Sequence, residues 1–190
     1  MAHTYPSLTI TQKSVAWQRI PRLAARLKKA AAVTQTHLPK QLQFPVSVTL
    51  LLTTNAAIRR LNHDFRGIDK PTNVLSFPQY EPADLRRLTA VKTPVEIGDI
   101  AIAYQYMVDE AKRDHKLLIN HITHLFIHGF LHLFGYDHLN DPDATRMERL
   151  ETKIMAALDL PDPYRDADIT EPKRARTTAK KRRATVRPKR

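Results

Sequence analysis

The chain has 190 residues, of which 42% are hydrophobic and 26% charged, and this is sufficient for one domain with a buried core. It contains no cysteine, which excludes disulfide bonds and thiolate metal sites. No segment has the pattern of a secretory signal, and none approaches the ~20 apolar residues of a membrane helix. We therefore expect a cytoplasmic protein with no membrane partner.

The net charge of +12 is concentrated near the C-terminus. Residues 173–190 contain ten Lys or Arg and no acid, which leaves 21 basic and 19 acidic residues in the remainder of the chain. A run of like charges is typical of a disordered segment. We therefore expect a domain over residues 1–165 and a disordered basic tail over 166–190. Such a tail favours salt-dependent contact with nucleic-acid phosphates, the alternative being a solvated segment that aids solubility.

Through residue 78, the hydrophobic pattern predicts in chain order a strand, a helix, a strand, a helix and a strand, at 8–11, 14–33, 45–53, 55–66 and 73–77. Pro21 should start the first helix late or kink it. Asn55 is the expected N-cap of the second helix, and Gly67 is expected to end it.

Residues 79–95 contain prolines and show no clear period, so we expect a loop there. A strand and three helices follow, at 96–102, 103–114, 117–134 and 141–158. Asp141 is the expected N-cap of the last helix, with Pro142 at its first position. Because strands and helices do not alternate strictly, the pattern predicts a single α+β domain in which about five helices pack on a sheet of about four strands.

Three histidines near the end of the helix predicted at 117–134 indicate a metal site. His128 and His132 are four residues apart and therefore lie on one face of that helix. Gly135 can end the helix in a left-handed cap, so that the chain returns and brings His138 close to them. Three histidine nitrogens with an open fourth position are typical of catalytic zinc. Nickel, copper and iron also accept nitrogen ligands, and a polar helix face that binds no metal is the alternative.

The spacing of these histidines matches the metzincin protease signature, except that those proteases have a glutamate directly after the first histidine. That glutamate is their general base, and here Gly129 occupies its position. The sequence therefore argues against peptide hydrolysis by this mechanism. Glycine costs about 1 kcal/mol relative to alanine within a helix, and we hypothesise that Gly129 leaves clearance for a substrate beside the metal.

Three blocks of sequence carry a resemblance to a known family. They are LNHDFRGIDKPTNVLSFP, IGDI and HGFLHLFGYDH, at residues 61–78, 97–100 and 128–138. Their order and separation resemble the YbeY family, whose members are bacterial metal-dependent endoribonucleases of rRNA maturation and ribosome quality control. The resemblance covers about residues 45–160 and leaves the basic tail outside the shared region.

The resemblance implies zinc ligands at His128, His132 and His138, a functional arginine at Arg66, and a compact α+β fold with a cleft between the metal and Arg66. It also implies that the substrate is single-stranded RNA. Precursor small-subunit rRNA, matured at its 3′ end, and the ribosome are then the expected physiological partners.

Several further residues are candidates for the site, and most of them also have a purely structural interpretation. Arg66 can hold a phosphate through its planar guanidinium and stabilise developing charge, or it is a surface arginine at a helix end. Lys70 is a candidate RNA contact. His124 can support a ligand or line the cleft, or it is a hydrogen-bonded buried histidine. Asp137 can orient a ligand imidazole or shape the turn.

Three functions remain open from the sequence. The first is a zinc-dependent endoribonuclease, in which the general base is a metal-bound hydroxide, a substrate oxygen or a residue distant in sequence. The second is a metallohydrolase of a peptide or small ester. The third is a non-enzymatic ribosome-assembly factor with a structural metal and an rRNA-binding tail.

Overall fold

A computed structural model describes residues 6–88 and 93–165 of the chain. Its sheet has four strands in the order β1-β2-β4-β3: β1 (Ser7–Gln12), β2 (Val46–Thr53), β3 (Val74–Pro78) and β4 (Val95–Ala103). The pairs β1–β2 and β2–β4 are parallel, whereas β3 runs antiparallel to β4. All four predicted strands are confirmed. The predicted tail at 166–190 lies outside the described residues.

The described residues form six α-helices: α1 (Leu23–His37), α2 (Asn55–Arg66), α3 (Pro82–Leu85), α4 (Tyr104–Arg113), α5 (Leu118–Leu133) and α6 (Asp141–Ala157). Two short 3-10 helices lie at Val15–Arg19 and Lys40–Leu42. The α+β class and the five predicted helices are confirmed. Helix α3 falls in the segment expected to be a loop, because Pro82 sits at the start of a helix, where a missing N–H costs nothing.

The first predicted helix is interrupted where Pro21 lies. Ile20, the residue before the proline, has extended backbone angles, as steric contact with a proline ring favours. Arg22 then adopts the left-handed conformation at φ 56°, and α1 begins at Leu23. The expectation that Pro21 delays the helix is therefore confirmed.

Two predicted helix caps are wrong by one residue. Thr54, and not Asn55, caps α2 by accepting a hydrogen bond from the Ala57 N–H. Asn55 instead accepts a bond from the Tyr106 N–H and so ties α2 to the start of α4. In α6 the cap is Asn140, one residue before Asp141. In both cases two adjacent polar side chains suit a cap, and for α2 the tertiary contact of Asn55 leaves the capping role to Thr54.

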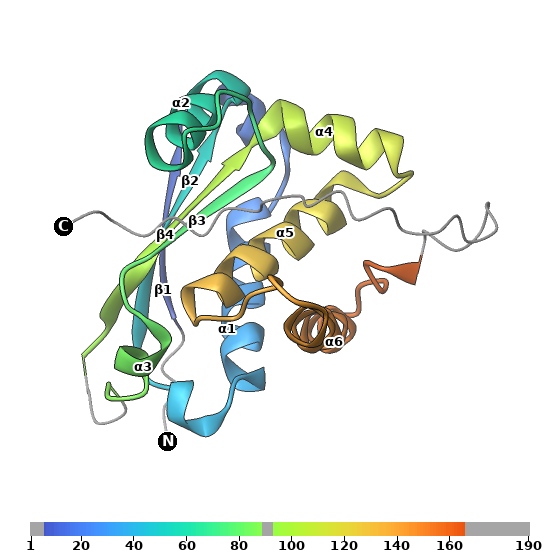
Figure 1. Ribbon diagram of the computed structural model, residues 1–190. Coiled ribbons are helices and arrows are strands. Elements are labelled where there is room, and N and C mark those ends of the chain that lie inside the picture. The colour runs from blue at the N-terminus through green and yellow to red at the C-terminus, as the bar shows by residue number, and fades with distance from the viewer. Residues whose placement is uncertain (1–5, 89–92, 166–190) are drawn as a thin grey trace.

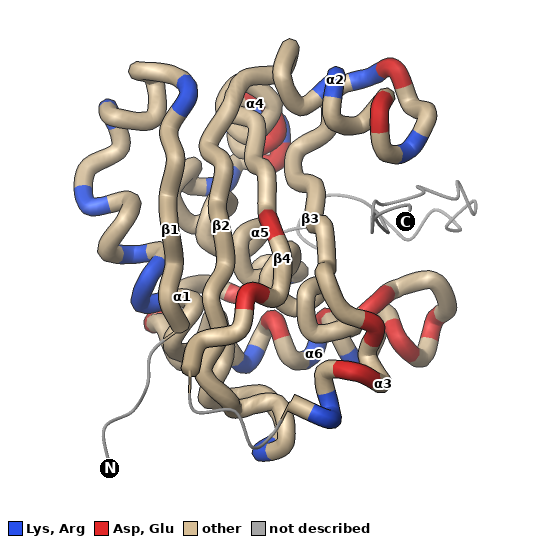
Figure 2. Tube along the Cα trace, turned by 90° about the vertical axis from the view of Figure 1, so that its left-hand side faces the viewer, with Lys and Arg blue, Asp and Glu red and all other residues tan. Residues whose placement is uncertain are grey.

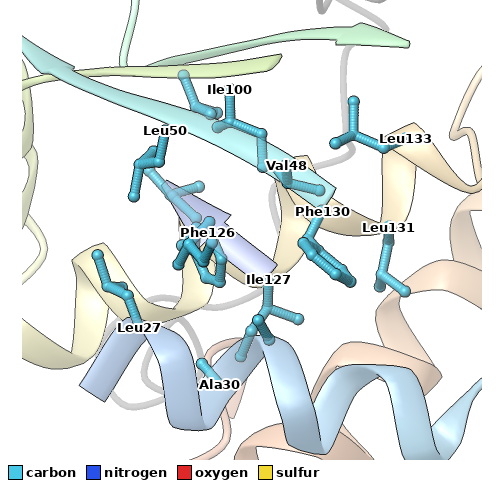
Figure 3. Close-up of a cluster of buried hydrophobic side chains, with 14 of the residues drawn as sticks. Leu27, Ala30, Val48, Leu50, Ile100, Phe126, Ile127, Phe130, Leu131 and Leu133 are labelled. Carbon is cyan, nitrogen blue, oxygen red and sulfur yellow. The ribbon is translucent and has the colours of Figure 1, made fainter. Parts of the chain in front are cut away.

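Helix α5 is the central helix of the molecule, because it lies between the sheet and the outer helices α1 and α6 (Figure 1). Phe126 and Phe130 are fully buried, with side chains of the sheet on one side and of α1 on the other (Figure 3). Each such aromatic contributes roughly 1.5–3 kcal/mol by burial. The residues that follow on α5 are therefore held in a fixed position against the sheet.

The opposite face of the sheet is more open. Figure 2 looks onto this face, with α1 and α5 behind the strands. Helix α2 packs over one end of it, and Phe65 contacts Phe77 of β3 at 5.0 Å between ring centroids. A cavity of about 480 Å³ lies here, lined by both aromatics and by residues of all four strands. In the described part of the chain, no helix is long and apolar enough to cross a lipid bilayer.

Candidate metal centre

The C-terminal end of α5 brings the three predicted histidine ligands together. Gly135 has a φ of 81°, and its N–H donates to the carbonyl of His132 while the Tyr136 N–H donates to that of Leu131. This pair of bonds is the Schellman ending, which reverses the chain after a helix. His138 therefore returns to His128 and His132, and one ligand nitrogen from each of the three lies within 4.8 Å of the others.

The donor set and its environment fit a metal ion. The Nε2 atoms of His128 and His132 face one another at 3.1 Å, and the buried Nε2 of His138 has no hydrogen-bond partner. A buried nitrogen without a partner is unfavourable, and a cation among the three would satisfy it. Neutral imidazoles suit zinc and other borderline metals.

Burial keeps His132 in the neutral form that binds a metal. Removal from water, together with the electrostatic influence of the neighbouring His128 and His138, lowers the pKa of His132 to about 3. An imidazole with so low a pKa keeps a free lone pair at neutral pH. Metal binding to His132 therefore requires no loss of a proton from this side chain.

Glu151 of α6 is part of this centre, although the sequence did not identify it as a site residue. Its side chain is fully buried, and its two oxygens accept hydrogen bonds from His128 Nδ1 at 2.7 Å and from His124 Nε2 at 2.8 Å. The Tyr164 hydroxyl donates a third bond. Burial alone would raise the pKa of the Glu151 carboxyl, but the electrostatic interaction with His128 and the hydrogen bonds from His124 and His128 hold it well below its usual range.

A signal for Glu151 was present in the sequence. It lies between Met147 and Ile154, four residues after one and three before the other, so all three fall on one face of the last helix. Both apolar neighbours are buried. A glutamate on an apolar helix face is rarely left without a partner, and it therefore indicates a buried polar contact.

Two further candidates contact other groups near the triad. His124 donates to Glu151, and its ring lies 6.4 Å from that of His128 between centroids. Asp137 accepts a hydrogen bond from the His138 backbone N–H at 2.7 Å, a contact that shapes the turn.

The hypothesis that Gly129 leaves clearance for a substrate is wrong. A Cβ atom there would lie 2.9 Å from Ser76 Oγ and 3.2 Å from methyl carbons of Ile100 and Val74. These side chains belong to β3 and β4, so Gly129 faces the sheet. Ser76 Oγ also donates to the Gly129 carbonyl at 3.1 Å. The missing side chain therefore allows α5 to approach the sheet closely.

Arg66 and Lys70 belong to a separate segment at the end of α2. The buried side chain of Asn62 accepts a hydrogen bond from Arg66 Nη1 at 3.1 Å and donates to the Lys70 carbonyl at 2.7 Å. One amide thus joins the Arg66 side chain to the Lys70 backbone. Gly67 ends α2 at φ 69°, as predicted. The cleft between Arg66 and the triad stays a prediction.

Comparison with known proteins places the chain in one family. The family described as Endoribonuclease YbeY matches residues 9–159. A protein of that name from Bradyrhizobium diazoefficiens is 45% identical over 166 residues, which are 86% of this chain and 89% of the relative. One from Nitrobacter hamburgensis is 52% identical over 62% of this chain and 60% of the relative. The solution structure of TM1509 from Thermotoga maritima is 23% identical, with a TM-score of 0.48 over 88% of this chain and 99% of that one. With a family match over most of its length, the chain belongs to the YbeY family of endoribonucleases.

Proposed function

We propose that the protein is a zinc-dependent endoribonuclease that cleaves single-stranded RNA. Its physiological substrate is precursor small-subunit rRNA in the cytoplasm, where it acts in 3′ maturation and in quality control of the ribosome. Family membership supports the endoribonuclease activity, since the relatives bear the name Endoribonuclease YbeY.

The convergence of His128, His132 and His138 carries the proposal. The ligand nitrogens of these three histidines lie within 4.8 Å of one another. Among residues 6–88 and 93–165, no carboxylate and no further imidazole joins this group. Three protein nitrogens without a fourth protein ligand favour a catalytic site over a structural one, because a structural zinc is normally held by four.

A zinc ion held by these histidines would activate a water molecule at neutral pH and polarise a phosphate oxygen. The protein supplies the neutral imidazole of His132 and the carboxylate of Glu151, which accepts a bond from His128. Position 129, which holds the general base in the metzincins, has no side chain and faces the sheet. Position 129 therefore supplies no general base in this protein.

Arg66 supplies the second requirement of phosphodiester cleavage, a positive group that holds the phosphate. Its planar guanidinium can donate two parallel hydrogen bonds to non-bridging oxygens and stabilise the charge that develops there. Asn62 holds Arg66 and the Lys70 backbone together, so the two cations can follow one RNA strand. The basic residues beyond 173 add sequence-independent attraction to RNA.

The proposal is tested with purified protein of known zinc content. The substrates are a single-stranded RNA, the same RNA as a duplex, and a precursor small-subunit rRNA fragment. We expect cleavage of the single strand and the precursor, and not of the duplex. His132→Ala should lose cleavage, whereas His63→Ala, which alters an exposed histidine on α2, should keep it.

Two outcomes contradict the proposal. If folded His132→Ala cleaves RNA at the wild-type rate, the triad is not the active site. If the zinc-loaded protein binds precursor rRNA without cleaving it, the protein is an assembly factor with a structural metal.

A further inference from the structure

We propose that Glu151 is a positioning residue of the metal centre, which fixes the tautomer of His128 and supplies a buried negative charge next to the cation. This inference rests on the proposed metal site but not on the RNA substrate. It makes α6 part of the centre, although none of the three ligands lies on that helix.

The first step concerns which nitrogen of His128 faces the metal. A carboxylate only accepts hydrogen bonds, so the contact of 2.7 Å with Glu151 Oε1 places the proton of His128 on Nδ1. A neutral imidazole carries one N–H, and the lone pair is then on Nε2. This is the nitrogen that lies 3.1 Å from His132 Nε2 within the triad. Glu151 therefore turns the metal-binding nitrogen of His128 towards the site.

The same carboxylate fixes a second imidazole. His124 Nε2 lies 2.8 Å from Glu151 Oε2, so His124 carries its proton on Nε2. The two histidines occupy successive turns of α5 on one face. Glu151 thus holds His124 and His128, and its bond to His128 Nδ1 restricts rotation of that ring about the Cβ–Cγ bond.

The second step concerns charge. A fully buried carboxylate is unfavourable without compensation, and the ion-pair partners of Glu151 in the described part of the chain are the two imidazoles. Neutral imidazoles supply hydrogen bonds but no formal positive charge. A divalent cation on the far side of the His128 ring would supply that charge. The negative charge of Glu151 and the positive charge of the metal then stabilise each other through one imidazole.

The backbone of Glu151 is rigidly placed for this role. Met147 and Ile154, on the preceding and following turns of α6, are buried in the same core as the apolar residues of α5. Helix α6 also begins only three residues after His138, and Asn140 caps it. One continuous segment therefore carries a metal ligand just before α6 and the positioning carboxylate on α6 itself.

The decisive measurement is zinc affinity, which does not depend on any RNA. Glu151→Gln keeps the size of the side chain, but its amide nitrogen donates and cannot accept from a histidine. We expect the zinc dissociation constant, measured by competition with a chromophoric chelator, to rise about 10- to 100-fold. Glu148→Gln, an acid three residues earlier on the same helix, is the matched control and should leave it unchanged. A folded Glu151→Gln variant with wild-type zinc affinity overturns the inference.

A second measurement uses the wild-type protein, so it does not depend on a variant that folds. Proton–nitrogen correlation spectra of the metal-free protein report the tautomer of each histidine. We expect His128 in the Nδ1–H form and His124 in the Nε2–H form, and an Nε2–H form of His128 overturns the inference. Weaker zinc binding in Glu151→Gln without RNA cleavage by the wild type would contradict the proposed function alone. RNA cleavage with unchanged zinc affinity would contradict this inference alone.

Discussion

His121 and Glu110 are joined by a buried hydrogen bond of 3.1 Å between Nε2 and Oε2, which ties α4 to the helix that carries the metal histidines. The same oxygen of Glu110 accepts a bond of 2.9 Å from the Asn73 side chain. Arg66 and Lys70 lie in the segment that runs from the end of α2 to Asn73, directly before β3. The predicted phosphate-binding segment and the metal-binding helix are therefore connected through one buried carboxylate.

Replacing Glu110 with alanine should destabilise the domain. The change leaves the buried polar atoms of Asn73 and His121 without their acceptor, and each unsatisfied buried group costs about 1–3 kcal/mol. We expect the free energy of unfolding, measured by urea denaturation, to fall by at least that amount. The neighbouring Asp109→Ala, at an exposed position of the same helix, should change it by less than about 0.5 kcal/mol. Equal effects of the two variants would contradict a special role for Glu110.

The contribution of Glu110 should depend on pH. Burial tends to raise the pKa of this carboxyl, but hydrogen bonds from His121 and Asn73 outweigh burial and lower it. Because the folded pKa lies below the unfolded one, the unfolded state takes up the proton first as the pH falls. The stabilisation is therefore complete above the unfolded pKa and is lost towards the folded pKa. The free energies of unfolding of wild type and Glu110→Gln should therefore converge as the pH falls below the unfolded pKa of about 4.5.

Arg66→Ala should lose RNA cleavage and keep zinc. Removing one group that stabilises transition-state charge typically lowers kcat about 10²- to 10³-fold. The zinc content should stay at one ion per chain, because Arg66 lies on α2, whereas the three histidines lie on α5 and directly after it. Arg60→Ala removes the same charge from an exposed position on α2 and should reduce kcat far less. Full cleavage by Arg66→Ala would remove this arginine from the mechanism.

Gly129→Ala should destabilise the domain although alanine is the better helix former. The new methyl group would stand 2.9 Å from Ser76 Oγ, and overpacking of this kind costs about 1–3 kcal/mol, more than the ~1 kcal/mol gained in helix propensity. Adding Ser76→Ala removes the closest atom and should recover part of the loss. A double-mutant cycle in thermal unfolding measures this coupling, and strictly additive effects would contradict the packing argument.

The sequence predicted the features that depend on local spacing. His128, His132, Gly135 and His138 lie within eleven residues, so helix geometry and the helix-ending glycine place the three histidines together. The strands and the break at Pro21 follow from equally local patterns.

The features that the sequence missed depend on distant partners. Gly129 was misread because the atoms that a side chain there would meet lie on β3 and β4. Glu151 and Glu110 were missed because their hydrogen-bond partners lie 23 and 11 residues away, on another helix. A buried acid can be recognised from its helix face, but its partner is fixed only by the tertiary packing.

Removing the metal should abolish cleavage without unfolding the domain. The core around Phe126 and Phe130 is built of apolar side chains, and the bonds of Glu151 to His124 and His128 join protein atoms. We expect the chelated protein to keep its helical circular dichroism and a cooperative thermal transition at a lower Tm. Zinc at a hundred times its Kd adds about 2.7 kcal/mol of stability, so the Tm should rise with zinc concentration. Restored zinc should restore cleavage. A domain that unfolds on chelation would instead indicate a structural metal, because the fold does not depend on a catalytic ion when the apolar core forms independently of it.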